Sequence, residues 1–150
     1  MRRRIFQIKE AKEIIKKALV CRLAVCEDSN PYIIPVCFGY KNGFLYIHSA
    51  PEGKKIEILK KNKKVCFEID IIEDIVSSDL ACEWDIKYES VIGFGEAFFI
   101  ENLEEKKEAL KCIFKHYSKS SPVISEDEIR KVTIIGIKIK NMTCKKSYGE

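Results

Sequence analysis

Two consecutive lysines follow a short Gly/Pro loop, and their type and position say most about the chemistry of this chain. The residues from Tyr46 to Lys55 read as a strand, then the loop Pro51-Glu52-Gly53, then a helix reaching Asn62. A helix start presents unpaired backbone N–H groups and a partial positive charge. Lys54 and Lys55 are therefore unfavourable there by about 0.3–1 kcal/mol each, unless a bound anion reverses the balance. The pair indicates a phosphate site, but a lysine-rich chain also places lysines at helix starts by chance, and the pattern alone leaves both interpretations open.

His48 is the second residue that could take part in chemistry. Histidine is a common proton donor and acceptor near neutral pH, so this side chain could donate a proton to a substrate or hold the substrate in place. A structural histidine with no catalytic role is the alternative. His116 is interpreted as a residue of a helix C-terminus. Glu68 and Asp70 share a strand face and are expected to be solvated or ion-paired.

The seven cysteines argue against a metal site and for a reducing compartment. They form no CxxC pair and have no matching histidine spacing, so we expect no zinc. Cys21, Cys37 and Cys66 fall inside apolar, strand-like runs, where a reduced thiol is expected to act as a small buried hydrophobe. This usage is typical of a cytoplasmic protein.

Composition indicates one globular domain over residues 1–150 and no membrane association. Hydrophobic residues make up 46% and charged residues 33% of the 150 positions, and no apolar run is long enough to cross a bilayer. The basic start of the chain, Met1 to Arg4, precedes no uninterrupted apolar segment, so export is not expected. The net charge of +4 comes from 27 basic and 23 acidic residues spread along the chain, which gives nucleic-acid binding little support.

The first half of the chain predicts one helix followed by strands. Apolar residues recur at helical spacing from Ile8 to Ala18. Asn42-Gly43 predicts a type I′ hairpin turn, and Pro35 marks an edge, a bulge or a backbone left free for a ligand. Strands are expected over Val20–Cys26, Tyr32–Tyr40 and Phe44–Ser49, with a turn at residues 27–31. Alternation in the last of these puts Phe44, Tyr46 and His48 on one face and Leu45, Ile47 and Ser49 on the other.

The second half continues the sheet. We expect a helix over Leu103–Tyr117, loops over residues 73–87 and 118–128, and strands over Val65–Ile72, Tyr88–Ile100 and Val132–Lys140. Gly93 and Gly95 permit strong bending or close approach of another backbone. About six antiparallel strands in a Greek-key-like order, with peripheral helices, predict an α+β fold built on a β-barrel.

Several motifs, taken in order, resemble one family. The chain resembles the FMN-binding split β-barrels related to pyridoxamine 5′-phosphate oxidase, and within them the 5-nitroimidazole-reductase-like branch. The resemblance covers most of the chain and rests on Arg22-Leu23-Ala24, Pro31 to Val36 with Phe38-Gly39-Tyr40, Leu45 to Ala50 with Gly53-Lys54, and Tyr88 to Gly93 with Gly95-Glu96-Ala97.

The resemblance implies a homodimer with FMN in a groove between two barrels. By this likeness Pro35, Val36 and Cys37 run along the isoalloxazine edge, and His48 and Ser49 reach the ribityl chain and phosphate. Lys54 and Lys55 match the basic pair that holds the phosphate, Ser90 matches a polar flavin contact, and Trp84 or Tyr88 helps to cover the ring. The family's Thr-Gly-Lys appears as Thr143-Cys144-Lys145, which leaves the role of Lys145 open. The chain also lacks the C-terminal arginine and histidine pattern of the true oxidases, so vitamin B6 oxidation is not implied.

The expected function is an FMN-dependent oxidoreductase, with His48 as its catalytic side chain. It would reduce a small electron-poor compound of nitroaromatic or quinone type, with NAD(P)H as a candidate donor. One alternative is a flavin- or haem-binding carrier or sensor without a dedicated substrate. A second is a small nucleic-acid-binding β-barrel that stacks bases on aromatic strand faces.

Overall fold

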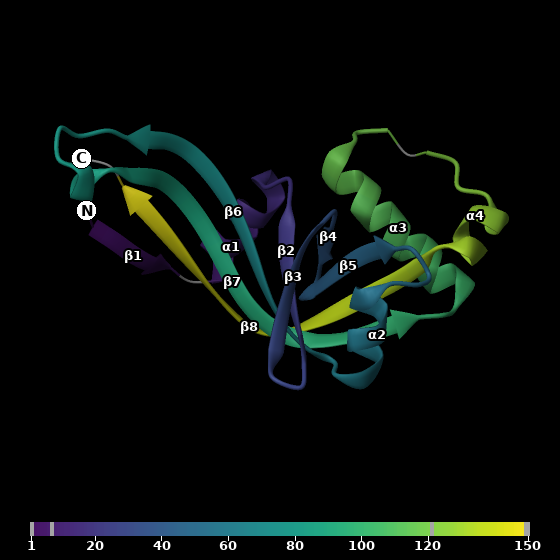
Figure 1. Cartoon of the computed structure of the whole chain (residues 1–150). Helices are drawn as coiled ribbons and strands as arrows, with labels where there is room; N and C mark the ends of the chain where they lie inside the picture. The colour runs from purple at the N-terminus through teal and green to yellow at the C-terminus, as the bar shows by residue number, and fades with distance from the viewer. Residues whose placement is uncertain (1, 7, 121, 149–150) are drawn as a thin grey trace.

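The computed structural model describes residues 2–6, 8–120 and 122–148 and combines one antiparallel sheet with four α-helices in these parts of the chain (Figure 1). A short 3-10 turn, Ala81–Glu83, separates two of the strands. The helices are α1 (Ile8–Lys17), α2 (Lys54–Lys61), α3 (Leu103–Tyr117) and α4 (Glu126–Lys131). The strands are β1 (Arg2–Phe6), β2 (Cys21–Glu27), β3 (Asn30–Val36), β4 (Gly39–Lys41), β5 (Phe44–Ser49), β6 (Lys64–Val76), β7 (Asp85–Ile100) and β8 (Thr133–Tyr148).

The sheet must curl because of one short connection. Its strand order is β3-β2-β6-β7-β8-β5-β4, with β1 paired to the far end of β8. β3 and β4 therefore stand at opposite ends of this order, yet only Cys37 and Phe38 separate them in the chain. Val36 and Gly39 are three residues apart, so their Cα atoms can be separated by at most about 11 Å, and the two ends of the sheet must come together. The result is the expected α+β split β-barrel.

The structure has eight strands in the described residues where six were expected. The predicted strand Tyr32–Tyr40 is broken at Cys37 and Phe38, and β1 was not predicted. β8 also continues beyond Lys140 to Tyr148, because its second half pairs with β7 on one edge and with β1 on the other.

The predicted loop over residues 73–87 was wrong. β6 continues to Val76 and β7 begins at Asp85, so only residues 77–84 connect them. The paired ends of β6 and β7 form an arm that reaches away from the barrel (Figure 1). In the described part of the chain none of residues 73–76 and 85–90 is fully buried, so no core imposes apolar alternation on the arm. Its pairing is supported instead by contacts such as the Lys87–Glu73 ion pair, at 3.3 Å.

The predicted connection over residues 118–128 was wrong at its end, where α4 begins. Ser125 caps this helix by accepting a hydrogen bond from the Glu128 N–H, and the Glu128 carboxylate accepts the Ser125 N–H in return. This capping box satisfies two backbone donors. The pattern Ser125-Glu126-Asp127-Glu128 was the sequence signal for it.

Three predictions from short sequence patterns are confirmed. Asn42 and Gly43 have φ values of 50° and 84°, as a type I′ turn requires. Pro35 lies on β3, which is an edge of the strand order. The β7–β8 ladder shifts register between Phe94 and Gly95, and a Cβ on Gly95 would lie 2.4 Å from the Lys138 carbonyl oxygen, which confirms the close backbone approach that this glycine permits.

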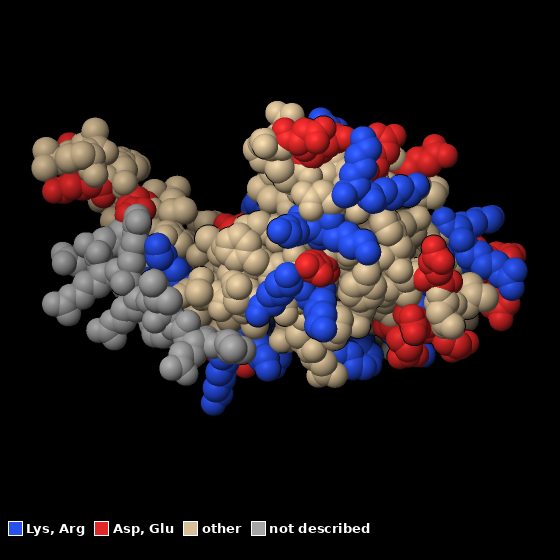
Figure 2. Space-filling view, turned by 90° about the horizontal axis from the view of Figure 1, so that it is seen from below, with Lys and Arg blue, Asp and Glu red and all other residues tan. Residues whose placement is uncertain are grey.

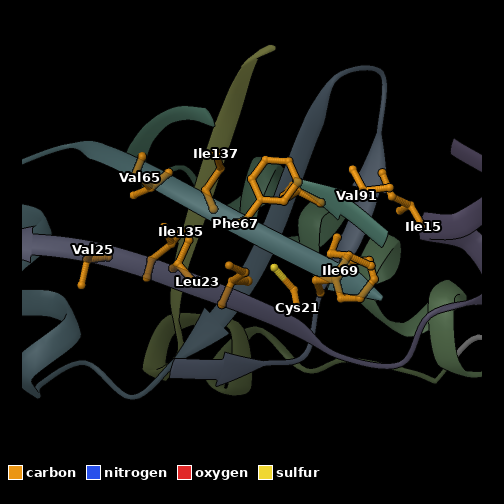
Figure 3. Close-up of a cluster of buried hydrophobic side chains, with 14 of the residues drawn as sticks. Ile15, Cys21, Leu23, Val25, Val65, Phe67, Ile69, Val91, Ile135 and Ile137 are labelled. Atoms are coloured by element: carbon orange, nitrogen blue, oxygen red, sulfur yellow. The ribbon is translucent and has the colours of Figure 1, made fainter. Parts of the chain in front are cut away.

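The barrel interior is filled by branched aliphatic side chains around Phe67 (Figure 3). α1 covers one opening with Ala11, Ile14 and Ile15, while α2 inserts Ile56, Ile58 and Leu59. Each of these isoleucine and leucine side chains stabilises the fold by about 1.5–3 kcal/mol when fully buried. This burial fixes α2, and with it the lysines at its start. None of the described helices is long and apolar enough to cross a membrane.

The tight packing at the corner between β3 and β4 indicates that one added methyl group at Gly39 would destabilise the fold. A Cβ on Gly39 would lie 2.6 Å from the carbonyl carbon of Cys112 and 2.7 Å from the Ile113 nitrogen, both of which are backbone atoms of α3. We expect Gly39→Ala to lower the free energy of unfolding by about 1–3 kcal/mol, because neither backbone can move aside cheaply. Urea titration followed by circular dichroism measures this change.

Gly136→Ala is the matched control. The three atoms nearest to its Cβ would all belong to the ring of Phe98, the closest at 2.3 Å, and that side chain is exposed enough to turn away. Its cost should be about 1 kcal/mol or less. Equal stability losses in the two variants would contradict the proposed role of the corner.

Candidate functional site

The start of α2 combines backbone and side-chain features that would favour a bound anion. Gly53 precedes the helix with φ 134° and ψ 171°, a backbone conformation that residues with a Cβ rarely adopt, and no side chain caps the first turn. Lys54 and Lys55 are the first two helical residues. The helix start therefore offers free backbone N–H groups next to two side-chain cations.

Few negatively charged side chains surround Lys54 and Lys55. Lys54 Nζ lies 4.5 Å from the centre of the Tyr32 ring, a cation–π contact with β3. Lys55 is half-buried, and this burial lowers its pKa. Neither lysine forms an ion pair within the described residues. Residues 54–64 hold six lysines and one glutamate, and basic side chains gather on the underside of the molecule, where α2 lies (Figure 2).

Tyr32 links the lysine pair to the strand that carries Pro35 and Val36. Pro35 is exposed, while Val36 packs partly against the core. Cys37 was expected to be buried, and that expectation was wrong, because β3 ends at Val36 and the thiol lies exposed at the corner. The structure thus brings Lys54 to the strand that ends in the Pro35-Val36-Cys37 segment.

The outer face of the sheet connects Pro35 to Ser90. Pro35 stands opposite Arg22, which stands opposite Glu68 on β6. One row further along, Ser90 stands between Asp70 and Lys145.

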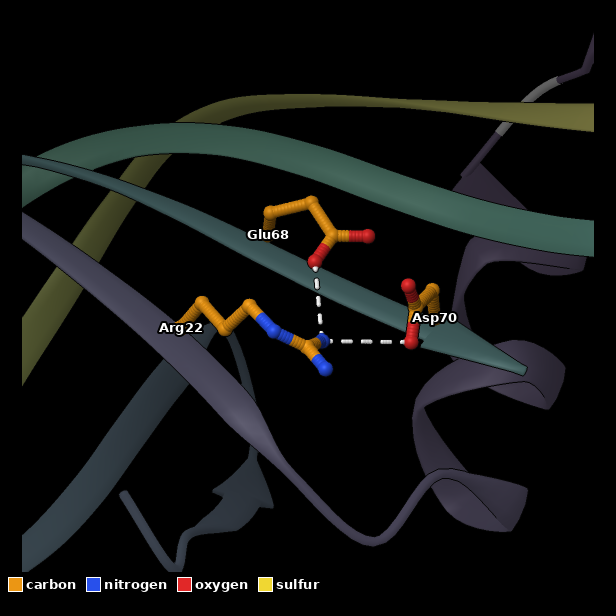
Figure 4. Close-up of polar contacts among 3 residues, drawn as sticks. All are labelled: Arg22, Glu68 and Asp70. Carbon is orange, nitrogen blue, oxygen red and sulfur yellow. Dashed lines mark hydrogen bonds and ion pairs between the residues drawn. The ribbon is translucent and has the colours of Figure 1, made fainter. Parts of the chain in front are cut away.

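The Arg22 guanidinium contacts both rows of paired residues, the row of Glu68 and the row of Asp70. Its Nη1 lies 3.3 Å from Glu68 Oε2 and 3.2 Å from Asp70 Oδ1 (Figure 4). Burial raises the pKa of Glu68, the Asp70 charge raises it further, and Arg22 lowers it. The expectation that these carboxylates are solvated or ion-paired is confirmed.

His48 and Ser49 point to opposite faces of β5, as the alternation predicted. Ser49 is half-buried, and its hydroxyl donates a hydrogen bond to the Ala50 carbonyl at 3.0 Å. His48 is exposed and lines a groove of about 330 Å³ between β5, α3 and α4, a feature that sequence reasoning missed. Its other walls are mainly apolar and include Leu110, Phe114, Ile124 and Val132. This groove offers one imidazole to a small apolar molecule.

Trp84 and Tyr88 lie on the arm, away from the lysine pair. Trp84 is 56% exposed just before β7, and Tyr88 pairs with Ile72 on β6. The arm and α2 lie at well-separated positions along the molecule (Figure 1). Within one chain these two aromatic residues are therefore not brought to Lys54 and Lys55.

The remaining titratable candidates have structural surroundings. Burial raises the pKa of Cys21 to about 12, so this thiol stays protonated. His116 Nε2 lies 2.5 Å from the Ala18 carbonyl oxygen, and its ring contacts Phe38. No group of three or more His, Cys, Asp or Glu in the described part of the chain could hold a metal ion.

Three similarities place this geometry among known proteins. The chain is 33% identical to a Bacteroides thetaiotaomicron protein described as a candidate 5-nitroimidazole antibiotic resistance protein; the match covers 97% of this chain and 89% of that one, with a TM-score of 0.84. An FAD- and haem-binding protein of Mycobacterium smegmatis has the same fold, with a TM-score of 0.86 at 16% identity over 99% of this chain and 75% of that chain.

The third similarity covers less than half of the chain. An uncharacterised protein of Rhizobium meliloti (strain 1021) is 33% identical over 66 residues, which are 44% of this chain and only 43% of that protein. The sequence profile of the pyridoxamine 5′-phosphate oxidase family matches residues 7–146. This match spans the whole barrel, including the α2 start, the outer sheet face and the arm, so the chain belongs to the pyridoxamine 5′-phosphate oxidase family.

Proposed function

We propose that this protein is an FMN-binding oxidoreductase that reduces a small electron-poor compound, of nitroaromatic or quinone type, with electrons from NAD(P)H. One observation carries the proposal: an uncapped helix start bears two lysines, one of them half-buried, with no acidic partner among the described residues. The chemistry of the family and the name of the Bacteroides relative support the class of reaction.

The residues at α2 fit a terminal phosphate. A phosphate monoester carries a charge of about −1.5 to −2 at pH 7 and offers three acceptor oxygens. Two lysines and the free N–H groups after Gly53 match both the charge and the number of acceptors. This match favours FMN, whose phosphate is terminal, over FAD, whose phosphates are internal to a dinucleotide.

The rest of the site is assigned to two chains. The Pro35-Val36-Cys37 segment, next to Tyr32 and Lys54, borders the flavin ring edge in this proposal. Trp84, Tyr88 and Ser90 would complete the ring pocket of a partner subunit, because the arm of one chain lies too far from its own α2 (Figure 1). Exposed apolar side chains on the arm and on the outer sheet face give a homodimer a surface to bury. They are Ile33, Ile72, Ile75, Leu80, Ile86, Ile92 and Phe94.

Flavin, when bound, supplies the two-electron transfer between donor and acceptor. The side chains of this protein would bind the flavin, orient the substrate and supply a proton to it. His48 stands in an apolar groove whose walls exclude water from one side of a small substrate. Its imidazole would hold the substrate or donate a proton to it.

The first prediction from this proposal tests the function itself. The purified protein should be yellow, release FMN on denaturation, and bleach with NAD(P)H under anaerobic conditions. Addition of a nitroaromatic or a quinone should restore the colour. His48→Gln should slow recovery by about 10–100-fold, because it lacks a titrating group, while bleaching stays unchanged.

The absorption spectrum also separates the oxidoreductase from a flavin- or haem-binding carrier or sensor. A flavin that bleaches but is not reoxidised by either acceptor indicates a carrier or sensor, and an intense Soret band indicates haem. Colourless protein that cannot be reconstituted with FMN contradicts the proposal. Equal recovery rates in His48→Gln and wild type leave this histidine without a catalytic role.

The second prediction tests the phosphate site. Lys54→Ala combined with Lys55→Ala should weaken FMN binding by at least about 100-fold, because each charged hydrogen bond contributes about 1.5–3 kcal/mol. Fluorescence titration of the apoprotein measures the affinity. Riboflavin, which lacks the phosphate, should bind both proteins about equally.

A matched control removes the same charge nearby. Lys60→Ala combined with Lys63→Ala changes two exposed lysines of the same segment and should alter FMN affinity by less than about fivefold, because screening leaves exposed charges little influence at a distance. If both double variants lost affinity equally, the assignment of Lys54 and Lys55 would be wrong.

The third prediction tests the assembly. Phe94 is 51% exposed on the outer sheet face. Phe94→Glu should convert a dimer into monomers on size-exclusion chromatography with light scattering, and FMN affinity should fall with it, because an unpaired charge cannot be buried cheaply in an interface. Val123→Glu changes a 98% exposed residue beside α4 and should leave the dimer intact. A monomeric wild-type protein that binds FMN tightly would refute the shared site.

A further inference from the structure

One hydroxyl ties three separate segments together at the corner of the barrel. Tyr117 is the last residue of α3. Its hydroxyl accepts a hydrogen bond from the Phe38 N–H at 3.1 Å and donates one to the Leu19 carbonyl at 2.8 Å. Phe38 belongs to the β3–β4 corner, and Leu19 belongs to the link between α1 and β2. The donor and acceptor roles are complementary, so both bonds can form at once.

The same corner is held on its α3 side by contacts that leave little freedom. Phe38 is fully buried, and its ring centre lies 4.3 Å from that of His116 and 6.4 Å from that of Tyr117. Gly39 lies against the α3 backbone, where no Cβ would fit. Because the Phe38 amide is anchored in this way, the position of the residue before it, Cys37, is fixed as well.

The Cys37 side chain lies near enough to the Tyr117 hydroxyl to influence its pKa. Burial raises the pKa of Tyr117 most, the Phe38 N–H lowers it, and the nearby Cys37 thiol raises it through its charge and a hydrogen bond. The thiol is exposed on its other side. Tyr117 thus sits directly behind the end of the Pro35-Val36-Cys37 segment.

We propose that Tyr117 is a positioning residue for the flavin: through Phe38 it holds the Pro35-Val36-Cys37 backbone at the place where that backbone meets the ring edge. This inference rests on the proposed function. Hydrogen bonds and dipoles at the ring edge set the colour and redox behaviour of a bound flavin, and a small displacement of the backbone that provides them changes both. Tyr117 would therefore influence the flavin without touching it.

The test is Tyr117→Phe, which removes the hydroxyl and keeps the ring. We expect far-UV circular dichroism to be unchanged and the FMN dissociation constant to rise about three- to tenfold, since the variant loses hydrogen bonds of ordinary strength. Under saturating FMN, the visible absorption band should shift and its vibrational structure should change. A merely structural role would lower the melting temperature and leave the spectrum of the fully loaded protein unaltered.

Tyr40→Phe is the matched control. Tyr40 lies on β4, just beyond the same corner, and packs partly against the same core. Its hydroxyl makes no hydrogen bond within residues 2–6, 8–120 and 122–148. This variant should bind FMN with the wild-type affinity and spectrum. An equal spectral shift in both variants would overturn the specific role of Tyr117.

Two outcomes separate the inference from the function on which it rests. If wild-type protein binds FMN and Tyr117→Phe matches it in affinity and spectrum, the positioning role is wrong and the proposed function stands. If wild-type protein binds no flavin, both are wrong.

A measurement on wild-type protein covers the case in which Tyr117→Phe fails to fold. The Phe38 amide should be protected from hydrogen exchange already in the apoprotein, because its partner is Tyr117 and not the ligand. Exchange there as fast as in an open loop would overturn the inference.

Discussion

The rest of the structure depends on the two-residue connection between β3 and β4. Cys37 and Phe38 join strands that stand at opposite ends of the sheet order, so the sheet has to close on itself. Closure turns the inner faces of the strands into one core around Phe67 and leaves the outer face of β3, β2, β6 and β7 free of helices. It also brings the end of β3 against α3, where Tyr117 and Gly39 set its position. Core, candidate site and exposed face all follow from this single constraint.

The lysine pair at the start of α2, Lys54 and Lys55, stands on a helix that is firmly packed against the core. α2 is held by three buried aliphatic side chains, so its first turn cannot swing away to relieve the crowding of positive charge. Lys54 rests on Tyr32, and Lys55 is partly withdrawn from water. In the proposed function, this arrangement, which has no acidic ion-pair partner in the described residues, would give an anion a preformed binding place with little reorganisation on binding.

Local signals in the sequence were sufficient for elements whose causes are local. The helix Leu103–Tyr117 was predicted to the residue from its apolar spacing, and Asn42-Gly43 from its need for positive φ. The lysine pair at a helix start was found in the same way. The arm was missed because strands with no core beneath them carry no alternation. The contacts of Tyr32 and Tyr117 could not be predicted, because they join segments that meet only once the barrel has closed.

The central position of β8 has a consequence for biosynthesis. This strand covers residues 133–148, yet it lies between β7 and β5 and also receives β1. While a ribosome is still making the preceding residues, β5 and β7 lack their shared neighbour and expose unsatisfied edges, which are prone to mispairing. The sheet can therefore join β5 to β7 only once residues 133–148 have been made, because β8 is the strand that links them.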